Sequence, residues 1–205
     1  MIKRCACVLL VFLLSTGSLV MANVGRQPAE LIEQFNTVLI DVMEHADELG
    51  YQGRFKKLEP VVRDSYDFKS IGRIVTGRYW NSWSVAQQQE FIDTFSELST
   101  ATYAYQFDGY NGESFELHSV TETAPEQAVV RVIMHKANGD TVQFDYMVRE
   151  TADRWKIVNV TANGVSDLAL KRAEFAKILK QEDYQALIDL LKGKIASYSE
   201  PANTK

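Results

Sequence analysis

The side chains of this sequence that could do chemistry are scattered, and their spacing matches no known catalytic or metal-binding pattern. His45, His118 and His135 fall on three different predicted elements, and none has a second histidine or a carboxylate at metal-ligand spacing. The sequence contains no His-Glu-x-x-His helix, no glycine-rich phosphate loop and no Gly-x-Ser-x-Gly nucleophile elbow. We therefore expect no catalytic residue, no metal site and no cofactor, and we predict that the protein is not an enzyme.

One group of side chains keeps an enzymatic alternative open. Tyr146, Asp145 and His135 could act together in a polar-tipped pocket, as in NTF2-like isomerases and dehydratases. Neighbouring residues of a strand point to opposite faces, so Asp145 should point away from Tyr146, which weakens this alternative. A second alternative is an adaptor whose groove binds a helix or strand of a partner protein; an exposed apolar patch would favour it.

The first residues have the order of parts of a cleavable secretory signal. Lys3 and Arg4 precede an apolar run from Cys5 to Leu14, and small residues follow as far as Ala22. We predict that residues 1–22 are removed after Ala22 and that the mature protein is exported to the periplasm. Cleavage also removes Cys5 and Cys7, the only cysteines in the sequence, and this excludes thiol catalysis and cysteine-ligated metals.

The charge balance excludes two classes of partner. The chain carries 22 basic and 27 acidic residues, a net charge of −5, and loss of Lys3 and Arg4 makes the mature chain more negative still. A nucleic-acid-binding protein would show a basic excess or a basic stripe, and neither is present, so we expect no nucleic acid partner. Electrostatic docking on an anionic membrane is disfavoured for the same reason.

The first half of the mature chain has the periodicity of amphipathic helices. Apolar residues recur at helical spacing from Pro28 to a helix end near Gly50, and a second helix, interrupted by Pro60, is predicted for 54–66. Asp67 is placed to cap a short helix that ends at Gly77. Ser84 opens a capping box at the start of the longest helix. That helix carries an aromatic-rich ridge: Phe91, Phe95 and Leu98, with Tyr103 and Phe107 on an adjoining face.

After Gly112 the period changes to two, which predicts strands. One begins near Phe115, a second spans 129–135, a third follows the Asn138-Gly139 turn, and a fourth spans 155–161. If that turn has two residues, Ala137 lies opposite Asp140. The face predicted to turn toward the helices then carries Val129, Ile133, Val142, Phe144, Tyr146 and Val148, with Arg131 and His135.

Two further helices complete the predicted fold. Ser166 is placed to cap a helix that ends near Lys180, and the last helix is predicted for 183–197. The pattern predicts an α+β fold in which helices pack on one face of a four-stranded antiparallel sheet, NTF2-like in general layout. We expect one domain over 23–198 and a polar, disordered tail over 199–205.

Several short blocks of the sequence resemble one protein family. They are Gly77-Arg78-Tyr79-Trp80, the 87–91 stretch Gln-Gln-Gln-Glu-Phe, the 102–110 stretch, 155–159, 164–168 and 171–175. Together they resemble the MlaC/toluene-tolerance family of periplasmic phospholipid-binding proteins, and the stretches around Tyr103 and Phe175 are similar to its hopanoid-biosynthesis-associated, HpnM-like branch. The sequence departs from the resemblance at Asn159, where an aspartate is expected.

The resemblance implies an apolar cavity between sheet and helices that holds acyl chains, with the lipid headgroup near solvent. It implies a lipid carrier that moves phospholipid, or a hopanoid-type lipid, between an inner-membrane ABC transporter with an MCE-domain subunit and an outer-membrane lipoprotein complex. The expected lipid-binding residues are Phe91, Phe95, Leu98, Tyr103, Phe107, Ile133, Val142, Phe144, Tyr146 and Val148.

Overall fold

The computed structural model describes residues 26–152 and 154–199. Its helices are α2 (Arg26–Glu44), α3 (Ala46–Ser65), α4 (Phe68–Thr76), the 3₁₀ helix η1 (Gly77–Ser82), α5 (Val85–Gln106), α6 (Asp167–Gln181) and α7 (Tyr184–Ser199). Its strands are β1 (Ser114–Ala124), β2 (Gln127–His135), β3 (Thr141–Glu150), β4 (Trp155–Ala162) and β5 (Val165–Ser166). The predicted secretory signal and all of the predicted tail except Ser199, which ends α7, lie outside the described residues. No described helix combines the length and apolar character that a membrane span needs.

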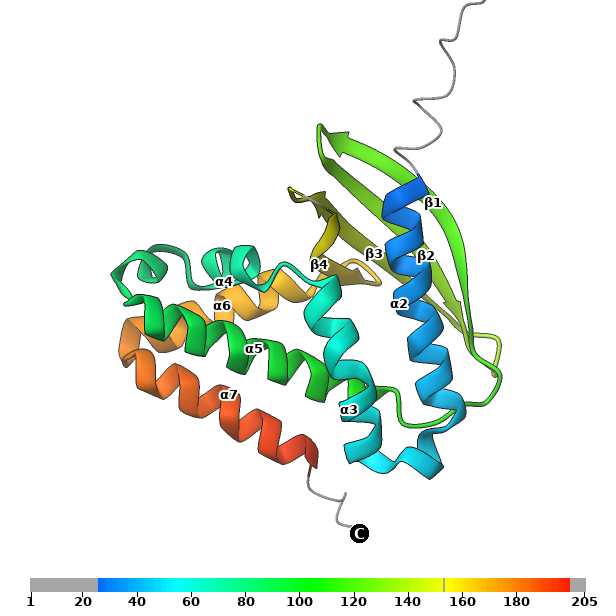
Figure 1. Cartoon of the computed structure of the whole chain (residues 1–205), viewed down its shortest axis with the longest axis horizontal. Helices are drawn as coiled ribbons and strands as arrows, with labels where there is room; N and C mark the ends of the chain where they lie inside the picture. Colours follow the sequence, from blue (N-terminus) through cyan, green and yellow to red (C-terminus); the bar gives the residue numbers. More distant parts are fainter. Residues whose placement is uncertain (1–25, 153, 200–205) are drawn as a thin grey trace, which may run out of the picture.

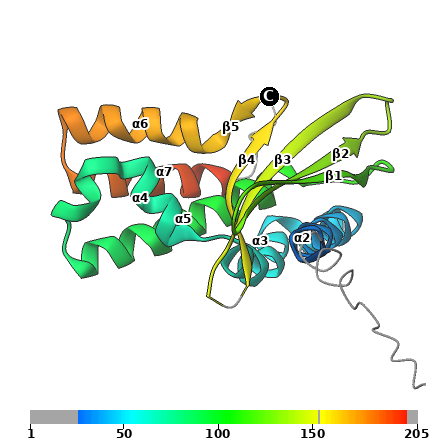
Figure 2. The same cartoon turned by 90° about the horizontal axis from the view of Figure 1, so that it is seen from above.

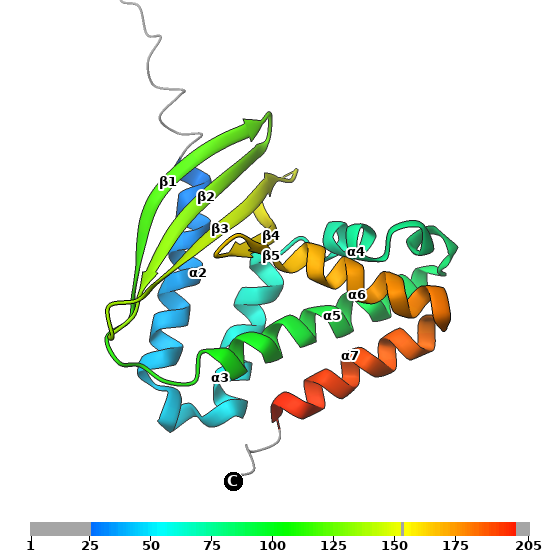
Figure 3. The same cartoon turned by 180° about the vertical axis from the view of Figure 1, so that it is seen from behind.

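α2 and α3 lie on one face of a curved antiparallel sheet (Figure 1, Figure 2). The strand order is β1-β2-β3-β4-β5, so the sheet has five strands and the prediction of four is wrong, since the short β5 was missed. Figure 1 shows α2 lying across the sheet and α4, α5, α6 and α7 gathered beyond its β4 edge, an arrangement that Figure 2 shows from above. From behind, β1, β2 and β3 stand in front of α2, and none of the described helices covers them (Figure 3). The predicted α+β class is confirmed; the likeness to NTF2-like proteins stays a prediction.

The capping signals in the sequence mark the starts of three helices correctly. The Asp67 carboxylate accepts a hydrogen bond from the Ser70 backbone N–H at the start of α4. Ser84 and Gln87 form the reciprocal capping box that opens α5. The Ser166 hydroxyl accepts from the Ala169 N–H at the start of α6. These contacts are local, which is why sequence spacing reveals them.

The predicted helix over Pro28–Gly50 is wrong at its end. α2 ends at Glu44 and α3 begins at Ala46, with Gly50 at φ +55° making a kink inside α3. α3 also runs through Pro60 without a break. The buried Arg54 ties this region to α5, because its guanidinium donates to the carbonyls of Ala104 at 2.9 Å and Ala46 at 3.0 Å.

The register of the β2–β3 hairpin differs by one residue from the prediction. Lys136 N–H donates to Asp140 O and Gly139 N–H to Lys136 O, so the turn holds three residues and His135 pairs with Thr141. Since side chains alternate along a strand, this shift moves every β2 side chain to the opposite face. Val130 and Val132 therefore point toward the helices with Tyr146, and the predicted inner positions of Val129 and Ile133 are wrong.

The buried side chains form two clusters. The larger lies among the helices and contains Phe91, Phe95 and Phe175. The smaller lies between the sheet and Ile32 of α2 and contains Val148. Tyr66 packs against both clusters, so the link between α3 and α4 lies where the sheet layer meets the helical layer.

Candidate functional site

A cavity of about 300 Å³ opens between α5, the amino end of α6 and the inner faces of β3, β4 and β5. Most of its wall is apolar, which is the usual character of a small-molecule pocket. The residues that line it are Tyr66, Phe95, Leu98, Ser99, Thr102, Tyr103, Gln106, Phe107, Phe144, Tyr146, Val160, Ala162, Val165, Asp167, Leu170 and Lys171.

The helical wall of the cavity comes from the second half of α5. Phe95, Leu98 and Thr102 follow one another at helical spacing, so one stripe of the helix faces the sheet. Tyr103 and Phe107 stack with their ring centroids 5.8 Å apart. On the opposite side, Phe144 and Tyr146 alternate along β3 with the outward-facing Asp145, so both rings project into the same space. The two periodicities together make the cavity aromatic on both sides.

Three tyrosine hydroxyls lie at the inner end of this cavity. The phenolic oxygens of Tyr66 and Tyr103 are 2.5 Å apart, and the Tyr146 hydroxyl donates to Asn36 Oδ1 at 3.4 Å. Phe35 of α2 makes edge contacts with all three rings, at centroid distances of 6.0, 5.2 and 6.5 Å. Burial raises the pKa of each of these phenols, so all three stay neutral at ordinary pH.

The outer end of the cavity carries charge. Asp167 opens α6, and Lys171 follows it one turn later on the same side of the helix. Desolvation raises the pKa of the Asp167 carboxyl, and the nearby Lys171 ammonium opposes this rise. Leu170 stands at this mouth with 58% of its surface exposed. The cavity is therefore aromatic inside, and its opening carries one acidic and one basic side chain.

The model of the MlaC family, described as MlaC protein, matches residues 33–193 of the sequence. This chain belongs to the MlaC family. The matched range runs from α2 to α7 and so includes every residue that lines the cavity.

Two curated relatives and one solved structure illustrate the MlaC-family likeness. The intermembrane phospholipid transport system binding protein MlaC of Haemophilus influenzae is 27% identical over 57% of this chain and 56% of its own length. The toluene tolerance protein ttg2D of Pseudomonas putida is 24% identical over 75% of this chain and 71% of its own length. The phospholipid-binding protein of Ralstonia solanacearum, solved in complex with a phospholipid, has a TM-score of 0.73 at 22% identity and covers 83% of this chain and 98% of its own; this likeness shows the fold.

Several of the residues expected to bind lipid lie at the cavity of this MlaC-family chain. They are Phe95, Leu98, Tyr103, Phe107, Phe144 and Tyr146. Their contact with a lipid stays a prediction.

The other four predicted residues do not line the cavity. Phe91 packs between Trp83 and Phe175 in the helical core. Val148 is fully buried in the cluster between the sheet and α2, and Val142 lies near the beginning of β3, opposite Met134. Ile133 is on the outer face of the sheet because the hairpin turn is one residue longer than predicted.

Sequence reasoning missed the residues that close the two ends of the cavity. Tyr66 follows the end of α3, outside any helical stripe, and reaches the cavity only because α3 and α4 meet there. Asp167 and Lys171 belong to the sequence blocks that resemble the family, and their spacing of four residues on a helix places them on one side. The sequence shows that spacing, but it does not show that α6 lies beside β4.

The side chains considered for an enzyme do not converge. Asp145 lies on the outer face of the sheet, where its carboxylate accepts two hydrogen bonds from Arg131, at 2.6 and 2.9 Å. His135 is also on that face and contacts Glu116 at 2.9 Å, which corrects its predicted inner position. Tyr146 alone points into the cavity. Across the described ranges, no group of three or more His, Cys, Asp or Glu side chains could hold a metal ion.

Asn159, where the sequence departs from the resemblance, supports the start of α6. Its Oδ1 accepts hydrogen bonds from the Ser166 hydroxyl at 3.1 Å and from the Leu168 N–H at 3.2 Å. An aspartate would offer the same acceptor atoms to these donors. The residue therefore positions the helix that carries Asp167 and Lys171.

Proposed function

We propose that this MlaC-family protein is a carrier of a membrane lipid, which holds acyl chains in the cavity between α5 and β3 and keeps the headgroup at the α6 mouth. The observation that carries this proposal is an aromatic, neutral interior combined with the charged side chains of Asp167 and Lys171 at the α6 mouth. The names of the Haemophilus and Pseudomonas relatives and the phospholipid in the Ralstonia structure support phospholipid as the cargo.

Burial of acyl methylenes in the cavity is a large favourable contribution to lipid binding. Since a methylene fills roughly the 30 Å³ that a water molecule has in the liquid, the cavity of about 300 Å³ holds about ten methylenes. Burial of about 0.8 kcal/mol per methylene then contributes about 8 kcal/mol before the entropy cost of binding. Because association itself costs several kcal/mol, the net affinity from these methylenes alone is weaker than the micromolar value that about 8 kcal/mol would give, and contacts at the mouth add to it.

The proposed setting is the periplasm, reached through cleavage after Ala22. There the protein would move lipid between an inner-membrane ABC transporter with an MCE-domain subunit and an outer-membrane lipoprotein complex. The word intermembrane in the name of the Haemophilus relative supports traffic between two membranes. A hopanoid-type lipid is the proposed variant of the cargo, and it rests on the HpnM-like stretches of the sequence alone.

The cargo can be identified directly. The mature protein, purified without detergent, is extracted with denaturing organic solvent, and the extract is analysed by mass spectrometry. We expect about one lipid per protein. An extract without lipid, together with no uptake of labelled lipid from vesicles, would overturn the carrier function and leave the adaptor as the alternative.

A matched pair of variants tests the cavity itself. Ala162 lies on the inner face of β4 and lines the cavity, whereas the preceding Thr161 lies on the outer face opposite Asp145. Ala162→Trp should fill the cavity and reduce co-purified lipid several-fold, while Thr161→Trp should leave it unchanged. Equal loading of the two variants would show that the lipid binds elsewhere.

A further inference from the structure

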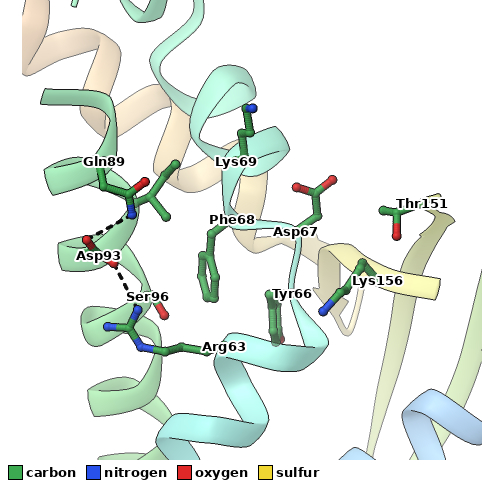
Figure 4. A pocket seen from close by; sticks show the side chains of 11 residues that line it. Arg63, Tyr66, Asp67, Phe68, Lys69, Gln89, Asp93, Ser96, Thr151 and Lys156 are labelled. Carbon is green, nitrogen blue, oxygen red and sulfur yellow. Dashed lines mark hydrogen bonds and ion pairs between the residues drawn. The ribbon is translucent and has the colours of Figure 1, made fainter. Parts of the chain in front are cut away.

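A second pocket, of about 330 Å³, lies between the amino end of α4 and the middle of α5. Figure 4 shows Ser96 and Asp93 on the α5 wall and Tyr66, Phe68 and Lys69 on the opposite wall. Tyr66 lines both this pocket and the main cavity. The two spaces are therefore separated by one side chain.

Ser96 presents an unexplained polar group to this pocket. Ser99, Thr100 and Thr102 of the same helix each donate a hydroxyl hydrogen bond to the carbonyl four residues earlier. The Ser96 hydroxyl is buried, with 1% of the residue exposed, and has no hydrogen-bond partner among the described residues. A buried hydroxyl without a partner is costly, so its presence in the pocket wall points to a ligand that supplies the missing bond.

The carboxylates around the pocket are already neutralised. Asp93 accepts from Arg63 at 3.1 Å and from Gln89 at 3.1 Å. Asp67 accepts from Arg149 at 2.7 Å. Asp64, beside the pocket, contacts both Lys156 and Arg154.

Of the three cations that line the pocket among the described residues, Arg63 and Lys156 are ion-paired and Lys69 is not. Lys69 stands in the first turn of α4, at the rim of the pocket. The Asp67 cap takes the N–H of Ser70, and the N–H groups of Phe68 and Lys69 have no acceptor inside the helix. The amino end of a helix favours an anion through these groups and through the helix dipole.

We propose that this pocket is a second binding site, for a phosphate group, formed by the amino end of α4, Lys69 and the Ser96 hydroxyl. In the bound state the Phe68 ring turns aside so that the hydroxyl reaches a phosphate oxygen. The phosphate belongs either to free inorganic phosphate or to the headgroup of a second lipid molecule, separate from the lipid whose headgroup lies at the α6 mouth; the lipid source rests on the proposed carrier function, and the site itself does not.

Amide chemical shifts of the delipidated mature protein test the site. The probes are inorganic phosphate, monomeric dihexanoylphosphatidylglycerol, and sodium chloride at matched ionic strength. We expect the Phe68, Lys69 and Ser96 amides to shift with phosphate or with the lipid, but not with chloride. Ser96→Ala should weaken binding about tenfold, the contribution of one hydrogen bond to a charged group. Lys69→Gln should weaken it several-fold, and Lys57→Gln, whose ammonium pairs with Asp41 instead, should not.

Each outcome has a distinct meaning. Shifts with both probes assign the site to a lipid phosphate, and shifts with phosphate alone assign it to the free anion. Absent shifts, equal shifts with chloride, or shifts that Ser96→Ala and Lys69→Gln leave unchanged would overturn the site. Mass spectrometry of the wild-type extract tests the carrier function independently. If the extract contains no lipid but the amides still respond to phosphate, the carrier function is overturned and this site is retained.

Discussion

The hydroxyls of Tyr66 and Tyr103 meet at 2.5 Å across the inner end of the cavity. Tyr66 follows α3 and Tyr103 belongs to α5, so this hydrogen bond joins two elements that are far apart in sequence. Tyr66 also stacks on Phe68, with ring centroids 5.5 Å apart. The pair therefore separates the main cavity from the pocket beside α4.

Loss of one hydroxyl of this pair should be measurable in stability. Tyr103→Phe leaves the Tyr66 hydroxyl without its partner and should lower the free energy of unfolding by about 1 kcal/mol. Tyr66→Phe should cost a similar amount. Because both single variants break the same bond, Tyr66→Phe combined with Tyr103→Phe should cost less than their sum in urea denaturation. Strict additivity would mean that the two hydroxyls do not interact.

The same tyrosines predict a loss of stability at high pH. Burial raises the pKa of Tyr66, Tyr103 and Tyr146 above the ordinary value, near 10, that applies in the unfolded chain. Above about pH 10 the unfolded chain releases these protons while the folded chain keeps them, so the free energy of unfolding falls as pH rises. Below that pH these groups add no slope.

Urea denaturation between about pH 8 and pH 11, with phenolate absorbance followed in parallel, checks this prediction. The phenols of Tyr66, Tyr103 and Tyr146 should ionise only as the protein unfolds, and so should that of Tyr184, whose pKa is raised by burial and by the Glu90 carboxylate. Tyr103→Phe should make the decline shallower because one titrating group is gone. If all nine tyrosines of the folded protein ionised near pH 10, the predicted coupling would be absent.

The hairpin register makes a prediction that separates two neighbouring residues. Val132 is 2% exposed and faces the helices, whereas Ile133 lies on the outer face. Val132→Ala should therefore lower the free energy of unfolding by about 2 kcal/mol through cavity formation. Ile133→Ala should cost less than half of that, although isoleucine is the larger side chain. Chemical denaturation of both variants measures the two losses of stability. A larger loss for Ile133→Ala than for Val132→Ala would support the two-residue turn instead.

The extra residue in the β2–β3 turn also shows where sequence reasoning stops. Asn138-Gly139 predicts a hairpin, but both a two-residue and a three-residue turn can contain this pair. The structure selects three, with Gly139 at φ +88°, because only that register directs Val130 and Val132 toward α2 together with Tyr146. Packing against a helix nearly a hundred residues earlier is not visible in the local pattern.

The candidate site divides in the same way. The α5 wall was predictable because Phe95, Leu98 and Tyr103 follow from the capping box and helical spacing of one element. Tyr66 and Lys171 come from other elements, and each reaches the cavity only through tertiary packing. Phe91 shares the ridge of α5 but faces Trp80 and Phe175, because the helix passes from the helical core into the cavity along its length.

The charged mouth predicts a preference among lipid headgroups that two substitutions should change in opposite directions. Asp167→Asn removes a carboxylate that repels a lipid phosphate, so the share of anionic phosphatidylglycerol over zwitterionic phosphatidylethanolamine should rise. Lys171→Gln removes the cation and should lower that share. Each change should be about twofold to fivefold, since a partly exposed charge contributes roughly 0.5–1 kcal/mol. Loading from vesicles that contain equal amounts of the two lipids, read by mass spectrometry, measures the ratio, and Lys192→Gln on α7, which pairs with Glu90 away from the mouth, is the control. If the ratio moved in the same direction in both variants, the headgroup would not lie between Asp167 and Lys171.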